Sequence, residues 1–135
     1  MRLNILAGLL LTAALPGAAI AADHTVQIGV GNTLTFTPAN LTIQAGDRVI
    51  FQSVAGFHNA VSNPGTVTAF RCGPNGCDGV GGGNGDPGSG TWSQTVTFPT
   101  AGTVGYFCEV HDGQGMTGVI QVNPVPVTLQ SFDID

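Results

Sequence analysis

A cysteine, a histidine and a methionine lie close together near the end of the chain and offer three kinds of metal-binding atom. Cys108, His111 and Met116 follow the pattern C-x2-H-x4-M, and Gly113 and Gly115 between them permit a tight turn. Sulfur ligands are soft and select copper over hard cations. Two imidazoles, one thiolate and a weak axial thioether define the copper site of blue electron-transfer proteins. The spacing therefore predicts most of such a site on one short loop.

The second imidazole must come from elsewhere in the chain. The sequence has three histidines, and His24 lies beside a predicted signal cleavage site, so we expect His58 to complete the site. Each ligand taken singly has an ordinary explanation, since a lone Cys or Met is usually a core residue. Three ligand types within nine residues make coincidence the weaker explanation. Zinc is the rival metal, but it normally takes four strong ligands, and a thioether suits copper better.

The elements that position these residues are predicted to be short strands. Apolar and polar residues alternate around residues 26–30, 34–36, 41–43, 48–53, 57–62, 92–98, 104–108 and 116–122. Turn residues separate these segments, and no stretch of ten or more residues after position 24 has a helical period. We therefore expect an all-β protein, a two-sheet sandwich or barrel of seven or eight strands.

Residues 73–90 lack this alternation. Nine of these 18 residues are glycine, with prolines at 74 and 87. The segment has no lysine to hold a phosphate, which excludes a nucleotide-binding loop. We expect a long, mobile surface loop, with a role in docking as the alternative.

The first 21 residues have the features of a secretory signal peptide. Arg2 precedes an apolar run from Ile5 to Ala14, Pro16 helps to break the run, and Ala19–Ala21 form a small-x-small cleavage site. The alternative is an uncleaved membrane anchor, but the break falls too early for a span of about 20 apolar residues. We expect an exported, periplasmic or secreted protein with a signal peptide (1–21), one domain (22–123) and a C-terminal tail (124–135).

The composition limits the classes of partner. Charged residues make up 8% of the chain, lysine is absent, and three arginines face eight acidic residues, for a net charge of −5. Such a chain cannot neutralise phosphates, so binding to nucleic acid or to an anionic membrane is disfavoured. We expect a monomer whose partners carry a basic patch.

From about Val26 to Val122 the sequence resembles the cupredoxins, the plastocyanin/azurin-like family of blue type 1 copper proteins. The resemblance rests on Phe36-Thr37-Pro38, Leu41-Thr42-Ile43, Ala45-Gly46-Asp47-Arg48-Val49, His58-Asn59-Ala60-Val61, Tyr106-Phe107-Cys108, His111 and Gly115-Met116. It implies a Greek-key β-sandwich with one copper ion near one end, held by His58, Cys108 and His111 with Met116 as the axial ligand. It further implies that Asn59 braces the loop that bears Cys108.

The resemblance also implies a soluble carrier that passes single electrons by outer-sphere transfer, with His111 as the electron port. A protein that stores or delivers copper is the alternative, and only the rate of metal exchange separates the two. An enzyme such as a copper oxidase would need a further open copper site, and the two committed imidazoles leave no ligands for it. A nucleophilic role for Cys108 would lack an orienting third group.

The region between residues 62 and 92 departs from the family's usual pattern. Its C-x4-C spacing and an oxidising compartment predict a disulfide between Cys72 and Cys77. A second metal site is the alternative, but no histidine lies nearby. A mature chain that began Ala22-Asp23-His24 could also wrap Cu(II) or Ni(II) in a square plane, although a plain exposed His24 is the simpler expectation.

Overall fold

The computed structural model describes residue 13 and residues 19–126, so the predicted signal segment up to residue 18 and most of the tail lie outside the described residues. The strands are β1 (Asp23–Ile28), β2 (Phe36–Thr37), β3 (Asn40–Gln44), β4 (Arg48–Ser53), β5 (Phe57–His58), β6 (Ala60–Ser62), β7 (Arg71–Gly73), β8 (Gly76–Cys77), β9 (Gly88–Ser89), β10 (Trp92–Thr97), β11 (Gly102–Phe107) and β12 (Thr117–Asn123). The helical elements of this part are two 3-10 turns, η1 (Val30–Asn32) and η2 (Asp112–Gln114). Over the same residues, no helix has the length and apolar character needed to cross a membrane.

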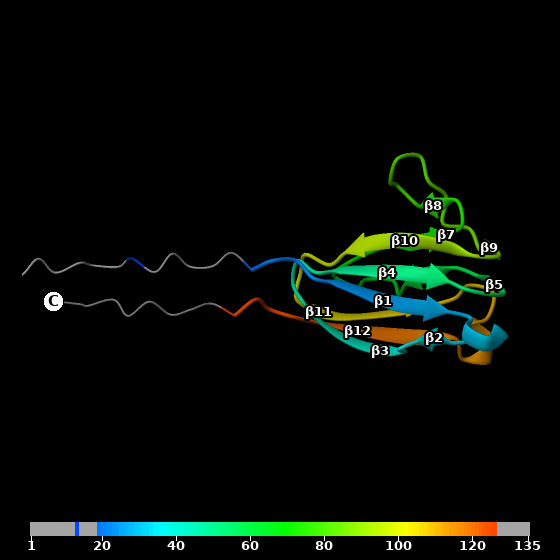
Figure 1. Ribbon diagram of the computed structural model, residues 1–135, viewed down its shortest axis with the longest axis horizontal. Helices are drawn as coiled ribbons and strands as arrows, with labels where there is room; N and C mark the ends of the chain where they lie inside the picture. Colours follow the sequence, from blue (N-terminus) through cyan, green and yellow to red (C-terminus); the bar gives the residue numbers. More distant parts are fainter. Residues whose placement is uncertain (1–12, 14–18, 127–135) are drawn as a thin grey trace, which may run out of the picture.

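The strands pack as a sandwich of two main sheets (Figure 1). One sheet has the order β10-β4-β1-β2 and the other the order β3-β12-β11-β6-β7-β8, while β5 and β9 form a separate two-stranded ribbon. β1 runs parallel to β4 and β3 runs parallel to β12, and the other pairs are antiparallel. The prediction of an all-β sandwich is confirmed.

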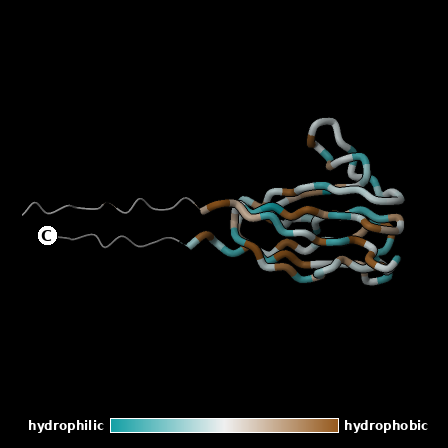
Figure 2. Tube along the Cα trace, in the orientation of Figure 1, coloured by the Kyte–Doolittle hydropathy of each residue, from teal (hydrophilic) through white to brown (hydrophobic). Residues whose placement is uncertain are grey.

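The apolar residues of the alternating segments pack in the space between the two sheets. Val26 and Ile28 of β1 and Val104 and Tyr106 of β11 belong to one core cluster, in which each of the four is at most 1% exposed. The ring of Tyr106 packs edge-on against Phe36, at 4.7 Å between ring centroids, an arrangement that aromatic pairs favour. Figure 2 shows the apolar stretches recurring along the strands of both sheets.

Three predicted strands differ in the structure, and of the segment predicted at 34–36 only Phe36 lies in a strand, β2. Val30 belongs to η1 rather than to a strand, because Gly29 adopts a left-handed φ of 75° and turns the chain at the end of β1. The predicted strand 57–62 is divided at Asn59, because β5 pairs with β9 whereas β6 pairs with β11 and β7. Asn59 thus lies where the chain passes from the ribbon to the six-stranded sheet.

The glycine-rich segment has structure of its own, so the expectation of a mobile surface loop is wrong for its base. β7 and β8 form a hairpin that extends the six-stranded sheet, and β9 pairs with β5. A Cβ at Gly85 would collide with the carbonyl oxygen of Arg71, and a Cβ at Gly73 with that of Asp86. Glycine therefore lets the returning chain lie directly on the backbone of the hairpin. The turn beyond β8 projects from the sandwich (Figure 1).

The chain enters β1 and leaves β12 at one end of the sandwich (Figure 1). There the N–H of Arg48 donates to the carbonyl of Ala22, at 2.9 Å, and the N–H of Ala45 donates to that of Asn123, at 2.8 Å. We call this end the terminal end. The ribbon of β5 and β9 lies at the opposite end (Figure 1).

Candidate metal centre

Three of the predicted ligands meet at the end of the sandwich away from the terminal end, which we call the ligand end. His58 ends β5, Cys108 follows β11, and His111 directly precedes η2. The Cys108 sulfur lies 3.7 Å from Nδ1 of His58 and 3.6 Å from Nδ1 of His111, and the two Nδ1 atoms are 3.2 Å apart. The structure thus places an imidazole from one strand against a thiol and an imidazole from a loop 50 residues further along the chain.

The spacing of these three atoms fits a metal ion. A point equidistant from all three lies about 2.0 Å from each, close to the length of a metal–imidazole bond. A metal ion at that point would contact all three ligand atoms at once. Within the described residues, His58, Cys108 and His111 form the cluster of His, Cys, Asp and Glu whose ligand atoms converge, all within 4.8 Å.

Met116 closes the ligand loop from the other side. Its carbonyl accepts a hydrogen bond from the N–H of Cys108, at 3.1 Å, and its own N–H donates to the carbonyl of His111, at 3.2 Å. Met116 and Cys108 are both fully buried, and His58 is 1% exposed. His111 is only half-buried, so it is the one member of the set that reaches solvent.

Two glycines fix the ring of His58. A Cβ at Gly56 would collide with Nε2 of His58, and a Cβ at Gly29 would collide with the carbonyl oxygen of Ala55. Both glycines have left-handed φ values, of 87° and 75°, which side chains other than glycine rarely tolerate. The backbone therefore packs against the imidazole and holds its Nδ1 toward Cys108.

Burial also favours the neutral form of this imidazole. Loss of solvent, together with the nearby His111, lowers the pKa of His58 below its ordinary value. The neutral ring that this favours has a free lone pair on one nitrogen, which a metal ligand requires.

Asn59 joins the upstream strand to the ligand loop. Its side-chain oxygen accepts the N–H of Glu109, at 3.0 Å, and its Nδ2 donates to the Glu109 carboxylate, at 2.6 Å. A further bond runs from Nδ2 to the carbonyl of Gly85, at 3.0 Å, and Asn59 is fully buried. The residue that follows Cys108 is therefore held at both its backbone and its side chain.

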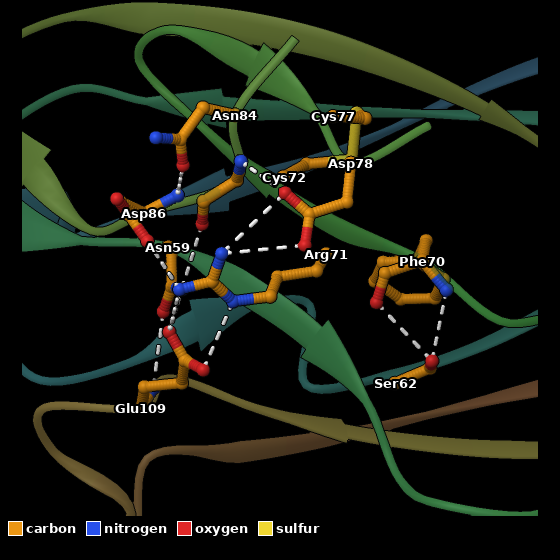
Figure 3. A network of polar contacts seen from close by, with 11 residues as sticks. Asn59, Ser62, Phe70, Arg71, Cys72, Cys77, Asp78, Asn84, Asp86 and Glu109 are labelled. Carbon is orange, nitrogen blue, oxygen red and sulfur yellow. Dashed lines mark hydrogen bonds and ion pairs between the residues drawn. A yellow bond between two sulfur atoms is a disulfide. The ribbon is translucent and has the colours of Figure 1, made fainter. Parts of the chain in front are cut away.

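Arg71 and Glu109 were not predicted from the sequence. Arg71 donates from Nε and Nη2 to the two carboxylate oxygens of Glu109, at 3.0 Å each (Figure 3). The Arg71 guanidinium is the main reason that the pKa of Glu109 lies below its ordinary value. One signal was available in the sequence: an acidic residue stands beside the cysteine ligand in a chain with only three cations.

The remaining predicted residues lie apart from the ligand cluster. Cys72 and Cys77 form the predicted disulfide, across the β7–β8 hairpin. His24 lies at the terminal end, where its Nε2 is 2.8 Å from a carboxylate oxygen of Asp47. The other carboxylate oxygen accepts the N–H of Ala22, at 2.9 Å. A square-planar site at residues 22–24 would have to displace these contacts.

The sequence matches the family model of copper-binding proteins of the plastocyanin/azurin family over residues 22–123. It is 40% identical to the plastocyanin of Scenedesmus fuscus over 106 residues, which cover 74% of this chain and 99% of that protein. It is 36% identical to a chloroplastic plastocyanin of Oryza sativa subsp. indica over 118 residues, covering 83% of this chain and 70% of the relative.

A similar fold is found in the pseudoazurin of Methylobacterium extorquens AM1. The two structures superimpose with a TM-score of 0.51 at 24% sequence identity, over 74% of each chain. The match of the family model and the identity to plastocyanins agree with the converging imidazole and thiol groups. The chain belongs to the plastocyanin/azurin family of copper-binding proteins.

Proposed function

We propose that this protein is a one-electron carrier in which His58, Cys108, His111 and Met116 would hold a single type 1 copper ion. The observation that carries the proposal is the convergence of two Nδ1 atoms and one thiol sulfur, each 3.2–3.7 Å from the others. A bound copper ion would supply the one-electron Cu(I)/Cu(II) couple. This donor set, with a buried thioether residue closing the loop, suits copper better than zinc.

The chain's own residues would keep the site in one geometry while the metal changes charge. Gly29 and Gly56 confine the His58 ring, and Asn59 ties the Cys108 loop to the upstream strand. Burial of Cys108 and Met116 keeps water from the thiolate side. A site that cannot relax loses little energy to reorganisation in each transfer, which favours fast electron exchange.

Electrons would enter and leave through His111, the half-buried ligand. Val110 directly precedes His111 in the chain, and Phe57 directly precedes His58. Their side chains are 42% and 47% exposed, so they add apolar surface near this point of access. Gly113 and Gln114 are exposed beside them. A small contact of this kind suits brief encounters with redox partner proteins, in which rapid release matters more than affinity. The net charge of −5 favours partners with a basic patch and disfavours nucleic acid.

We further propose that the protein is exported to the periplasm or secreted and acts as a monomer, with residues 1–21 removed, residues 22–123 as the domain and residues 124–135 as a tail. Cleavage after Ala21 would turn the nitrogen of Ala22 into an ammonium group. That nitrogen already lies 2.9 Å from the Asp47 carboxylate, so the new charge would meet an opposite one. The Cys72–Cys77 disulfide suits an oxidising compartment.

The visible spectrum of the Cu(II)-loaded protein tests the copper site. We expect an intense thiolate-to-copper band that disappears on reduction and in Cys108→Ser. The disulfide cysteines provide the matched control, because Cys72→Ser/Cys77→Ser should keep the band. A colourless protein that prefers zinc over copper would refute the assignment.

Copper storage or delivery is the second candidate function, since it would use the same ligands. Transfer of Cu(I) to a chelator separates the two. A carrier retains its metal through many redox cycles, whereas a delivery protein releases it readily. The confined His58 ring and the buried Cys108 favour retention.

A further inference from the structure

Arg71 is the centre of a polar network that joins the glycine-rich insertion to the ligand loop (Figure 3). Besides its two bonds to Glu109, its Nη1 lies 3.3 Å from a carboxylate oxygen of Asp78, and its Nη2 lies 2.5 Å from one of Asp86. One guanidinium thus contacts three carboxylates, two from the insertion and one from the residue after Cys108. The Arg71 side chain is 27% exposed and that of Glu109 is 34% exposed, whereas those of Asp78 and Asp86 are 50% and 57% exposed, so the contact with Glu109 is the best shielded of the three.

The same network returns to the ligand loop by a second route. Asp78 accepts the N–H of Gly85, at 2.7 Å, and the carbonyl of Gly85 accepts Nδ2 of Asn59, at 3.0 Å. Asn59 in turn binds Glu109 at its backbone and its carboxylate. The path from Arg71 through the insertion to Asn59 and back through Glu109 is a closed ring of hydrogen bonds. In closed networks each bond restrains the geometry of the next.

The disulfide fixes the two residues that begin this ring. Arg71 directly precedes Cys72, and Asp78 directly follows Cys77. The N–H of Asp78 also donates to the carbonyl of Arg71, at 2.9 Å. The hairpin therefore holds an arginine and an aspartate side by side, and the glycine at position 85 lets the returning chain lie against them.

We propose that Arg71 is a positioning residue for the copper site: through Glu109 and Asn59 it fixes the chain at Cys108, and its charge compensates the carboxylate beside the thiolate. The proposal rests on the proposed function for its redox consequence, but not for its structural one. It gives the insertion a purpose, which is to hold the ligand loop from outside the sandwich. Copper and its ligands would then keep one geometry even though the loop lies at the protein's surface.

The structural consequence can be measured without any metal. In the metal-free protein, we expect Arg71→Gln to speed amide hydrogen exchange at Glu109 about tenfold, because a charge-assisted support of that residue is lost. Arg48→Gln is the matched control, since Arg48 also donates two bonds to one carboxylate, that of Asp23, but at the terminal end. Arg48→Gln should leave the exchange at Glu109 unchanged.

The redox consequence is measured by voltammetry on the copper-loaded variants. Arg71→Gln leaves the Glu109 carboxylate uncompensated near the site, which favours the more positive Cu(II) and lowers the reduction potential. Adding Glu109→Gln removes the unbalanced charge and should restore most of the potential. Arg71→Lys keeps the charge without the two-pronged contact, so it should rescue the potential but not the slow amide exchange.

Equal exchange rates and equal potentials in Arg71→Gln and Arg48→Gln would overturn the proposal and make the insertion a surface addition only. If Arg71→Gln does not fold, Glu109→Gln alone keeps the size of the side chain, and its failure to change exchange at Asn59 and Cys108 would overturn the proposal equally. A protein that shows the expected exchange differences but no blue copper spectrum would instead refute the proposed function.

Discussion

The ligand end and the terminal end of the sandwich both bring polar groups together, but they leave them in opposite states. At the terminal end, the Asp47 carboxylate accepts hydrogen bonds from the N–H groups of Ala22 and Gln44 and contacts His24. Groups of the protein itself therefore stabilise its negative charge. At the ligand end, His58, Cys108 and His111 bring their metal-ligand atoms within 4.8 Å of one another. The side-chain hydrogen bonds of Asn59 and Arg71 at this end are made to Glu109, which follows the ligand Cys108 in the chain.

The two ends therefore differ in what stabilises them. At the terminal end, the contacts of Asp47 are all made by the folded chain itself. At the ligand end, Asn59 and Arg71 bind Glu109 beside Cys108, and a copper ion would bind the ligand groups themselves. Stability should therefore depend on copper at one end and on a carboxylate at the other, and substitutions can separate the two.

Copper removal should have the largest effect. Ligand binding to the folded state stabilises it by about 4 kcal/mol when free ligand exceeds the Kd a thousandfold. We expect chelation to lower the Tm of the native protein strongly and that of Cys108→Ser hardly at all. Calorimetry with and without copper measures both. If the Tm of the native protein were the same with and without copper, the ligand end would not depend on the metal for its stability.

Asp47→Asn tests the terminal end. It should cost about 2–3 kcal/mol at neutral pH, because hydrogen bonds to a buried charge are lost or weakened. The pKa of Asp47 is lowered to about 2, chiefly by the N–H groups of Ala22 and Gln44 and then by His24. A carboxyl with a lowered pKa stabilises the fold above its unfolded pKa of about 4 and loses this contribution as the pH falls through the folded value.

The native protein should therefore lose stability between about pH 4 and pH 2, and Asp47→Asn should lose less over that range. Urea unfolding at several pH values measures the difference. The copper spectrum of Asp47→Asn at neutral pH should match that of the native protein. An altered spectrum would contradict the independence of the two ends.

Opening the disulfide should have an intermediate effect that reaches the ligand end. Removing a crosslink that closes so short a loop costs about 2 kcal/mol in the chain-entropy model. We expect Cys72→Ser/Cys77→Ser to keep the blue band but to speed amide exchange at Glu109, because Arg71 adjoins Cys72. If the amide exchange rate at Glu109 in this variant equalled that of the native protein, the hairpin would have no influence on the ligand loop.

The two arginine pairs give the smallest effect and the sharpest contrast. Asp23 and Arg48 have side chains that are 47% and 49% exposed, so water screens the pair and Arg48→Gln should change the free energy of unfolding little. Arg71→Gln should cost more, because its partners are tied to one another and the pair is less exposed. Denaturant unfolding of both variants makes the comparison, and equal costs would reduce Arg71 to an ordinary surface residue.

The sequence predicted what depends on local pattern and on ligand chemistry. Alternation located the main strands, and β4 coincides with the predicted segment 48–53. The cysteine spacing predicted the disulfide that the structure contains. His58 was assigned to the copper site by elimination, and the structure places its ring beside Cys108.

The parts that the sequence did not predict depend on tertiary contacts. Glycine-rich composition suggested mobility, but Gly73 and Gly85 are needed because another backbone lies against them. Arg71 is 38 residues from Glu109, and only the pairing of β6 with both β7 and β11 brings them together. The split at Asn59 likewise follows from a partner strand, β9, that composition alone would not suggest.

The start of β1 and the end of β12 both lie at the terminal end, which has a practical consequence for handling the protein. A linker or surface attachment joined near residue 22 or residue 123 would pull from the end opposite β5, the strand that ends at His58 (Figure 1). A protein attached to a support in this way would have its ligand end directed toward the solution. Tethering at either terminus should thus orient the protein without blocking electron exchange with a soluble partner.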